Sequence, residues 1–364
     1  MFSLSSCSEL YNKIDDLNKS YNISDDSEAE ISKSDESEII SYPSGEISNV
    51  SFHFIDYKMD YTGDTTYIKA GDLDILIDAG PRNSAAENIE NYIDKYCTDN
   101  TLEYVIATHA HQDHIAGFVG TSTSPGIFDY YKIENYIGFS YKNTTSKVST
   151  QFMEKLDELE EKGTNVYTGS DFYGDTKIKE PVISLAKGVT LTVLDNYYYH
   201  HKSSNENNYS LSTLFTAGSL NALFTGDLEE EGEKYLVELN ELPKIDLFKA
   251  AHHGSYTANS EELLSVIDPK NVVFLCIAGS PEYTSKKENM FPSQAVIDRL
   301  SKYTDQMYCI RVVDPDNDED SLSLNGNIVF SFIDGNDVKV DCSTSNKVLK
   351  DTEWFKENRT FPSN

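Results

Sequence analysis

Three of the eight histidines in this chain fall within six residues, in the segment Thr108-His109-Ala110-His111-Gln112-Asp113-His114. The apolar run Tyr104–Ala107 directly before it predicts a buried strand, so the histidines occupy the turn that follows a strand. Imidazole and carboxylate groups are the ligands that zinc and similar divalent ions take in proteins. A surface loop that is rich in histidine by chance is the alternative, and the H-x-H-x-D-H spacing after a strand disfavours it. The segment can serve two adjacent ions, one through His109 and His111 and the other through Asp113 and His114.

The rest of the chain alternates strand and helix patterns without a repeat of 20–50 residues, which predicts an α/β or α+β domain over about residues 50–345. Ser84 is the expected N-cap of the first helix, and Asp334-Gly335 predicts a tight hairpin turn. The predicted strands cover residues 51–57, 65–70, 74–78, 104–107, 190–195, 210–216, 221–225, 246–250, 271–277, 307–313, 327–333 and 337–341. The predicted helices cover residues 84–97, 149–162, 261–266 and 293–303, with one more after Asp227.

The first residues have a different composition from the rest. Residues 20–48 contain nine serines and eight acidic residues, which cannot bury enough apolar surface to fold. We therefore expect a disordered acidic leader or tether over residues 1–48, and a C-terminal tail over residues 346–364. The opening Leu4-Ser5-Ser6-Cys7 resembles the lipobox of bacterial lipoproteins. This gives two expectations: an extracellular protein with a lipid anchor at Cys7 if Met1 is internal to a signal peptide, or a cytoplasmic protein with a disordered leader.

The formal net charge of the chain is −31, from 61 acidic and 30 basic side chains. A protein that coats long nucleic acid needs a basic surface to displace counterions, so this charge makes long nucleic acid a less favoured partner. No apolar run approaches the roughly 18 residues that indicate a transmembrane helix. Five cysteines without a C-x-x-C pair do not indicate a disulfide scaffold.

The histidine segment resembles the signature of the metallo-β-lactamase fold, and three further segments are similar to other elements of that family in the family's order. They are Ile75-Leu76-Ile77-Asp78-Ala79-Gly80, Leu223-Phe224-Thr225-Gly226-Asp227 and Lys249-Ala250-Ala251-His252-His253-Gly254-Ser255. The resemblance covers about residues 50–310. It implies an α/β fold, a four-layer αββα sandwich with metal ions at the edge where the two sheets meet. It also implies that Asp78 supports the metal ligands from behind and that Asp227 bridges two ions.

One segment departs from the commonest family pattern. Most members carry a Gly-His histidine between the first cluster and the bridging aspartate, whereas this chain reads Glu206-Asn207-Asn208-Tyr209-Ser210-Leu211. That pattern, together with the opening at residues 52–56 and Gly63-Asp64-Thr65, resembles a narrower branch. The branch includes the hydrolase domain of the DNA-uptake protein ComEC and the teichoic-acid phosphorylcholine esterase, which bind two metals without the mid-chain histidine. The pair His200-His201 is the alternative source of the missing ligand.

Coordination chemistry and this resemblance together give the expected ligands. One divalent ion would be held by His109, His111 and Asp227, and the other by Asp113, His114, Asp227 and His253. Zn²⁺ is the expected metal, with Mn²⁺ as the alternative, and a metal-bridging hydroxide would be available near neutral pH. The alternative role for Asp227 is the N-cap of the helix that follows it.

Asp113 and His252 are the residues that we assign to catalysis. By resemblance to the esterase, His253 is the ligand of the pair, which leaves His252 to face the substrate as a proton donor. The alternative for His252 is to orient a ligand from behind. Asn207 and Ser210 are expected to stabilise the loop around the site rather than to contact substrate.

These expectations describe a dinuclear metal-dependent hydrolase. A phosphodiesterase is the favoured activity, because two adjacent metal ions can hold the attacking and the leaving oxygen of a phosphoryl group. The substrate would be a small or surface-attached phosphodiester or a nucleic acid. The acidic charge disfavours a nuclease, as does Phe291-Pro292, which stands where ComEC-type domains usually carry His-Pro. The alternatives are hydrolysis of a lactone, thioester or other acyl substrate on the same fold, and a metal-binding module without catalysis.

Overall fold

The computed structural model describes residues 46–174, 178 and 180–362. The expected leader, residues 1–48, lies outside the described residues up to position 45, and Cys7 with its lipobox-like segment lies outside them as well. None of the helices in the described part of the chain combines the length and the apolar character needed to cross a lipid bilayer.

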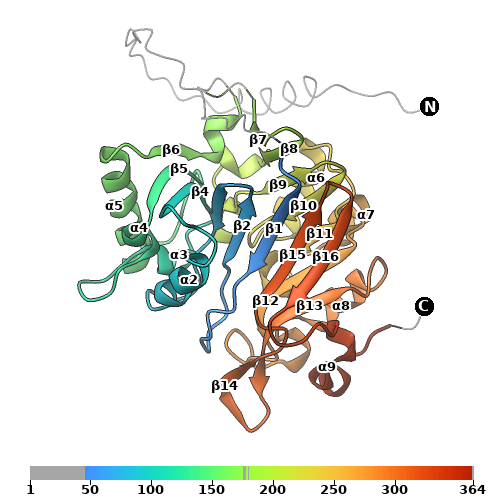
Figure 1. Cartoon of the computed structure of the whole chain (residues 1–364). Helices are drawn as coiled ribbons and strands as arrows, with labels where there is room; N and C mark the ends of the chain where they lie inside the picture. The colour runs from blue at the N-terminus through green and yellow to red at the C-terminus, as the bar shows by residue number, and fades with distance from the viewer. Residues whose placement is uncertain (1–45, 175–177, 179, 363–364) are drawn as a thin grey trace, which may run out of the picture. The chain divides into compact units, whose positions relative to one another are not determined.

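Two mixed sheets of eight strands each form the body of the described domain (Figure 1). The first sheet has the order β16-β15-β1-β2-β3-β4-β5-β6, and the second has the order β14-β13-β12-β11-β10-β9-β8-β7. Neighbouring strands are parallel from β3 to β6 and from β10 to β13, and antiparallel elsewhere. The strands are β1 Asn49–Phe54, β2 Thr66–Ala70, β3 Leu73–Ile77, β4 Thr101–Ala107, β5 Lys132–Gly138, β6 Asn165–Thr168, β7 Val182–Ala186, β8 Val189–Val193, β9 Thr213–Ala217, β10 Leu220–Phe224, β11 Leu247–Lys249, β12 Asn271–Ala278, β13 Met307–Asp314, β14 Asn317–Ser323, β15 Ile328–Ile333 and β16 Asp337–Cys342.

The helices lie in two groups, with α2 to α5 beside the first sheet and α6 to α8 beside the second (Figure 1). Their bounds are α2 Ala85–Ile93, α3 Gln112–Ile115, α4 Ile127–Tyr130, α5 Lys147–Glu161, α6 Glu230–Leu239, α7 Glu261–Ile267, α8 Gln294–Leu300 and α9 Glu353–Asn358. Short 3-10 helices are η1 Ala116–Phe118, η2 Gly169–Phe172, η3 Tyr197–Tyr199, η4 Glu206–Tyr209, η5 Ala251–Gly254, η6 Lys287–Asn289 and η7 Leu349–Asp351.

Three buried apolar clusters establish the order of the layers. The central cluster joins the two sheets, and in it the rings of Phe52 on β1 and Phe215 on β9 meet edge to face at 5.2 Å. A second cluster packs α2 and α5 on the outer face of the first sheet, and a third packs α6, α7 and α8 on the outer face of the second. Because side chains alternate along a strand, each sheet can bury both faces in this way. The predicted helix–sheet–sheet–helix sandwich is therefore confirmed.

The predicted elements are present, with ends displaced by at most four residues. Asp334 and Gly335 have φ angles of +49° and +67°, as the predicted hairpin turn between β15 and β16 requires. Ser84 occupies the N-cap position of α2, but its side chain makes no capping hydrogen bond, so the expected capping interaction is absent. Strands β5, β6, β7 and β14 and helices α4 and α9 were not predicted. In residues 346–364, expected to be a tail, Leu349 and Phe355 are buried in the third cluster.

Most segments that carry the sequence motifs follow the carboxyl ends of strands, whereas Glu206–Leu211 lies just before β9. Five turns follow a strand that has a parallel neighbour: those after β3, β4, β10, β11 and β12. In open α/β sheets, such ends are where ligands bind. The topology therefore brings the motifs of both sheets to one place.

Candidate metal centre

The turn between β4 and α3 positions the histidine segment through Thr108. The amide and the hydroxyl of Thr108 each donate a hydrogen bond of 2.8 Å to the Asp78 carboxylate at the end of β3. His109 and His114 are fully buried, whereas His111 and Asp113 are partly exposed. Nε2 of His109 and Nδ1 of His111 lie 2.9 Å apart. The first two histidines of the segment therefore present ring nitrogens to one point.

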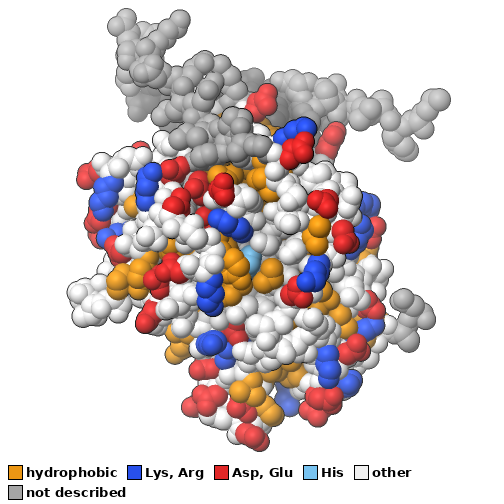
Figure 2. Space-filling view, viewed as in Figure 1, with side chains coloured by type: hydrophobic (Ala, Val, Ile, Leu, Met, Phe, Trp, Pro, Cys, Tyr) orange, Lys and Arg blue, Asp and Glu red, His pale blue; other side chains and the backbone are white. Residues whose placement is uncertain are grey.

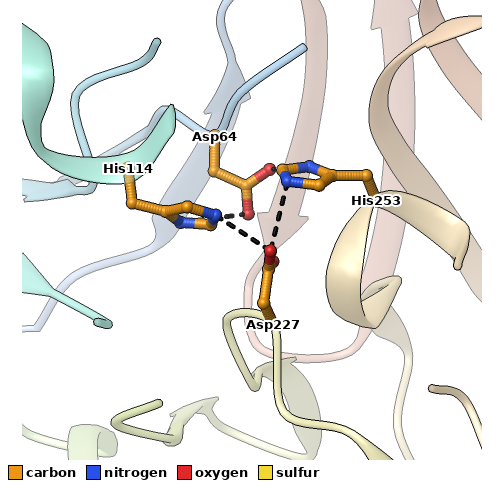
Figure 3. A group of neighbouring side chains, drawn as sticks. All are labelled: Asp64, His114, Asp227 and His253. Carbon is orange, nitrogen blue, oxygen red and sulfur yellow. Dashed lines mark ion pairs between the residues drawn. The ribbon is translucent and has the colours of Figure 1, made fainter. Parts of the chain in front are cut away.

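His114 and His253 share one geometry although they come from opposite halves of the domain (Figure 3). His114 Nδ1 lies 2.7 Å from Asp78 Oδ2, and His253 Nδ1 lies 3.0 Å from Asp64 Oδ1. Both Nε2 atoms lie 3.2 Å from the same atom, Asp227 Oδ2. A carboxylate on Nδ1 fixes the tautomer and the ring orientation and leaves Nε2 available to a metal. The expected supporting role of Asp78 has this contact as its structural basis.

Asp227 reaches the centre from the turn after β10. Gly226 has a φ of +55°, and a Cβ at this position would lie 2.7 Å from Thr108 Cβ, so the turn needs glycine to pack this closely. The Asp227 amide donates a 3.1 Å hydrogen bond to Ser210 Oγ, and the loop-stabilising role of Ser210 stays a prediction. Helix α6 begins at Glu230, with Glu229 at its N-cap position. The alternative in which Asp227 is the N-cap of this helix is therefore wrong.

Asp113 and His109 lie on either side of these groups. Asp113 Oδ2 lies 3.2 Å from His253 Nε2 and accepts a 3.0 Å hydrogen bond from the Tyr283 hydroxyl. His109 Nε2 lies 4.0 Å from Asp227 Oδ2. Asp227 thus lies near ring nitrogens of three expected ligands, His109, His114 and His253. Asp113 joins this group through its contact with His253, and His111 joins it through its contact with His109.

Two buried residues of the centre, Asp64 and Lys249, were missed in the sequence as functional candidates. Their side chains form an ion pair, and Lys249 Nζ also lies 3.6 Å from Asp227 Oδ1. Ligand atoms of Asp64, His114, Asp227 and His253 all lie within 4.8 Å of one another. The signal for Lys249 was a lone charge at the end of the otherwise apolar β11 strand, because such a charge is rarely buried unless it is paired.

The charges of the centre do not balance. Four carboxylates, those of Asp64, Asp78, Asp113 and Asp227, face the single ammonium group of Lys249, which leaves three formal negative charges uncompensated while the histidines are neutral. Buried charges are stable only when they are paired or coordinate a metal. Divalent cations would supply the missing positive charge.

The pKa values of the two central histidines reflect the same imbalance. Burial disfavours the charged imidazolium, but the surrounding carboxylates, Asp227 foremost, outweigh burial and raise the pKa of His114 and His253 well above the usual value. His114 Nε2 and Asp227 Oδ1 are buried without a hydrogen-bond partner in the described part of the chain. Coordination would satisfy both atoms, so the residues present fit divalent metal ions.

His252 lies at the mouth of the centre rather than within it. Its Nε2 lies 3.9 Å from Asp227 Oδ2, its Nδ1 lies 3.2 Å from Glu229 Oε1, and 19% of its side chain is exposed. Asn207 and Thr257 donate to the same Glu229 oxygen, at 3.0 and 3.1 Å. Asn207 therefore bonds to a side chain at the mouth of the centre, and its loop-stabilising role stays a prediction. Glu229 was missed because no fixed spacing links it to His252.

The tandem histidines depend on an unusual backbone. His252 and His253 have φ angles of +47° and +55°, in the left-handed region that non-glycine residues seldom adopt. The planes of the two rings differ by 62°. Strained residues of this kind cluster at functional sites. Here the strain allows adjacent histidines to take different environments, one buried and one at the mouth.

His200 and His201 lie elsewhere. His201 Nδ1 lies 2.9 Å from the Tyr197 carbonyl oxygen and its ring stacks on the Tyr197 ring. Within the described ranges, neither histidine belongs to the group of side chains whose ligand atoms converge. The aromatic rings of Tyr283 and Phe291 form part of the wall of the candidate centre. Their centroids lie 6.5 and 5.8 Å from that of the His253 ring, and neither was predicted to be a site residue.

Part of this chain is similar in sequence to known proteins. Residues 50–127 match the model of the Metallo-beta-lactamase superfamily. ComE operon protein 3 of Bacillus subtilis (strain 168) is 25% identical over 208 residues, which are 56% of this chain and 23% of that protein. Recombination protein 2 of Haemophilus influenzae is 35% identical over 98 residues, which are 27% of this chain and 11% of that protein. The matched region thus spans less than a quarter of either relative.

Solved structures align more weakly. The metallo-β-lactamase fold protein YhfI from Bacillus subtilis aligns with 15% identity and a TM-score of 0.32, over 56% of this chain and 70% of that one. A mutant of the β-hydroxylase CmlA aligns with 12% identity and a TM-score of 0.39, over 78% of this chain and 55% of that one. The family-model match and the layer order confirm the metallo-β-lactamase fold, and the two sequence relatives confirm the similarity to the ComEC-type branch. At this level the chain has the metallo-β-lactamase fold and a candidate metal site.

Proposed function

We propose, on the premise of a metallo-β-lactamase fold, that this chain is a dinuclear metal-dependent phosphodiesterase. The observation that carries the proposal is the concentration of carboxylates at the centre, where three more acidic groups than ammonium groups surround ring nitrogens already oriented by carboxylates. Such a site is built for cations, and two adjacent cations suit a phosphoryl group better than a single carbonyl.

The proposed ligands divide into two sets that meet at Asp227. His109 and His111 would hold one ion. Asp113, His114 and His253 would hold the other. The position of Asp227 Oδ2, 3.2 Å from two of these nitrogens and 4.0 Å from a third, supports a bridging role for this carboxylate. When bound, the ions would lower the pKa of a coordinated water and stabilise the charge that develops on phosphoryl oxygens.

The residues of the chain would supply positioning and proton transfer. Glu229 accepts from His252 Nδ1 and so directs Nε2 toward the centre, where it could donate a proton to the leaving oxygen. The Tyr283 hydroxyl holds Asp113 from the side open to solvent, where 49% of the tyrosine is exposed. Lys249 neutralises Asp64, which limits the excess negative charge beneath the ligands.

Purified protein supplied with Zn²⁺ or Mn²⁺ should bind about two ions per chain and hydrolyse bis(p-nitrophenyl) phosphate, and it should not hydrolyse nitrocefin. The control is Asp227→Asn, which removes one charge from the centre at unchanged size. Hydrolysis of nitrocefin or of a thioester without phosphodiester cleavage would instead support the acyl alternative. A folded, metal-loaded protein that cleaves none of these substrates would contradict the proposed activity.

A further inference from the structure

One cation near the candidate centre has no carboxylate partner among the described residues. The chain has four arginines, and three of them hydrogen-bond to acceptors: Arg299 and Arg359 to backbone carbonyl oxygens, and Arg311 to Asp56 and Ser321. Within the described residues, Arg82 is the one arginine whose guanidinium has neither an acceptor nor an ion-pair partner. In a chain with twice as many acids as bases, an arginine free of carboxylates points to a function for its charge.

The guanidinium of Arg82 is held in place by an aromatic ring. Its Cζ lies 3.9 Å from the centroid of the Tyr61 ring, a cation–π contact. Tyr61 is 40% exposed and Arg82 is partly exposed. Stacking orients the planar group while its N–H donors remain available, because hydrogen bonding to the guanidinium occurs in its plane.

Contacts on both sides of this pair place it beside the expected metal ligands. The carbonyl oxygen of Pro81, the residue before Arg82, accepts a 3.1 Å hydrogen bond from Gln112, which lies between two expected ligands. On the Tyr61 side, a Cβ added to Gly63 would lie only 2.6 Å from the Asp113 carbonyl oxygen, so this loop packs directly on the α3 turn. The Arg82–Tyr61 pair is thus anchored on both sides to the segment from His111 to Asp113.

The same rim continues to the side where substrate would enter. The Thr62 amide donates a 2.8 Å hydrogen bond to the carboxylate of Glu282, and the next residue, Tyr283, donates to Asp113. The loops after β1, β3 and β12 therefore form one continuous edge of the centre. On the face of the molecule that Figure 2 shows, acidic and basic side chains are interspersed rather than gathered in one basic patch.

We propose that Arg82, oriented by Tyr61, binds a second phosphate group of the substrate next to the phosphodiester that is cleaved. The inference rests on the proposed phosphodiesterase function and narrows it to substrates that carry a flanking phosphate. An exposed guanidinium forms a bidentate pair with a phosphate, and the acidic centre gives little other attraction to a polyanion. A cation–π contact that only stabilises the loop is the competing account.

The test uses two chromogenic esters that differ by one phosphate: thymidine 5′-(p-nitrophenyl phosphate) with and without a 3′-phosphate. For the metal-loaded native protein we expect kcat/KM to be about tenfold higher for the ester with the 3′-phosphate, mainly through a lower KM. Arg82→Gln should abolish this preference and leave the other ester within about twofold. Arg82→Lys should keep part of the preference, since it keeps the charge but loses the fork. Tyr61→Leu should reduce the preference more than Tyr61→Phe.

Lys339→Gln is the matched control, because it removes one exposed positive charge on β16, a strand at the far edge of the first sheet. It should change neither substrate's kinetics. The inference would be overturned if Arg82→Gln kept the preference, or if Lys339→Gln lost as much of the preference as Arg82→Gln does. Either result would leave the phosphodiesterase function standing.

A binding measurement separates this failure from failure of the proposed function. Calorimetric titration of the metal-loaded protein with thymidine 3′,5′-bisphosphate and with thymidine 5′-monophosphate reports the phosphate subsite without any hydrolysis. An Arg82-dependent preference for the bisphosphate in a protein that cleaves neither ester would support the subsite and reject the phosphodiesterase. Equal affinities in the native protein would reject the subsite.

Discussion

Two regions of the domain bury histidine side chains, and they treat them in opposite ways. His53 on β1 is 2% exposed, and its ring nitrogens bond to two hydroxyl groups among the described residues, Tyr92 Oη and Ser51 Oγ, each at 2.8 Å. Burial lowers the pKa of His53 to about 4. His114 and His253 are buried more completely, yet the carboxylates around them raise their pKa values well above the usual value.

The comparison shows that burial alone does not identify a metal-binding histidine. A hydroxyl group can donate or accept, so the surroundings of His53 satisfy the neutral ring and leave no charge to be balanced. Carboxylates around His114 and His253 create a demand for positive charge that a proton or a metal must meet. The carboxylates, more than the histidines, distinguish the candidate centre from an ordinary buried ring.

The largest effect on metal content and activity should come from replacing a histidine of the candidate centre. The same replacement at His53 should have no effect on the bound metal. His253→Ala should lower the bound metal by about one ion per chain and reduce kcat/KM for bis(p-nitrophenyl) phosphate by roughly a thousandfold, the cost of losing several kcal/mol of charge stabilisation. His53→Ala should leave the metal content unchanged. Elemental analysis and steady-state kinetics of both variants measure this, and equal metal loss in the two would end the distinction.

A smaller effect is expected at the mouth of the centre. His252→Ala should keep both ions and lower kcat by about a hundredfold, with little change in KM, as for the loss of a general acid. Glu229→Gln should lower kcat less, because the amide can still hold the ring at Nδ1. Metal loss in His252→Ala with full occupancy in His253→Ala would show that the roles of the tandem pair are reversed.

The next smaller effect is expected on metal affinity, when a carboxylate that orients a histidine ring is replaced. Asp78→Asn keeps the size of the side chain but weakens its contact with His114 Nδ1, so the metal affinity should fall by about 10- to 100-fold. Competition with a chelator measures the dissociation constants. Glu103→Gln is a suitable control, since Glu103 is also a buried carboxylate of the first sheet but bonds to the amide of Asp74 away from the centre. An affinity unchanged in Asp78→Asn would contradict the supporting role of this residue.

Much of this centre could be predicted because its ligands are encoded in short segments. The turn from His109 to His114 follows a strand, and Asp227 and His253 lie in segments with their own local patterns. Glu229 and Tyr283 could not be found in this way, because each joins the centre only after both sheets have packed. Asp64 lies in a recognised segment, Gly63-Asp64-Thr65, but nothing local to that segment indicates its contact with His253. The supporting contacts, such as Asp64 on His253 Nδ1, connect residues far apart in the chain and leave no spacing to detect.

The smallest predicted effect tests the other side of the comparison, the pH dependence of folding stability at His53. Its pKa is about 4 in the folded protein and about 6.5 in an unfolded chain. The unfolded state therefore binds more protons between these values, and the stability that the neutral ring contributes is present above pH 6.5 and is lost as the pH falls toward 4. Between pH 7 and pH 5 this amounts to about 2 kcal/mol in the free energy of unfolding.

His53→Gln removes the titrating group while an amide can still bond to the two hydroxyls. Urea unfolding of both proteins at pH 7 and pH 5 should show that the native chain loses about 2 kcal/mol more than the variant over this interval. Metal loss at low pH does not confound the result, because His53 makes no contact with the candidate centre and the metal contribution cancels in the difference between the two proteins. Parallel pH profiles would mean that His53 keeps an ordinary pKa in the folded state. Burial without carboxylates would then not suffice to hold a histidine neutral, and the contrast with His114 and His253 would have to rest on the metal ligands alone.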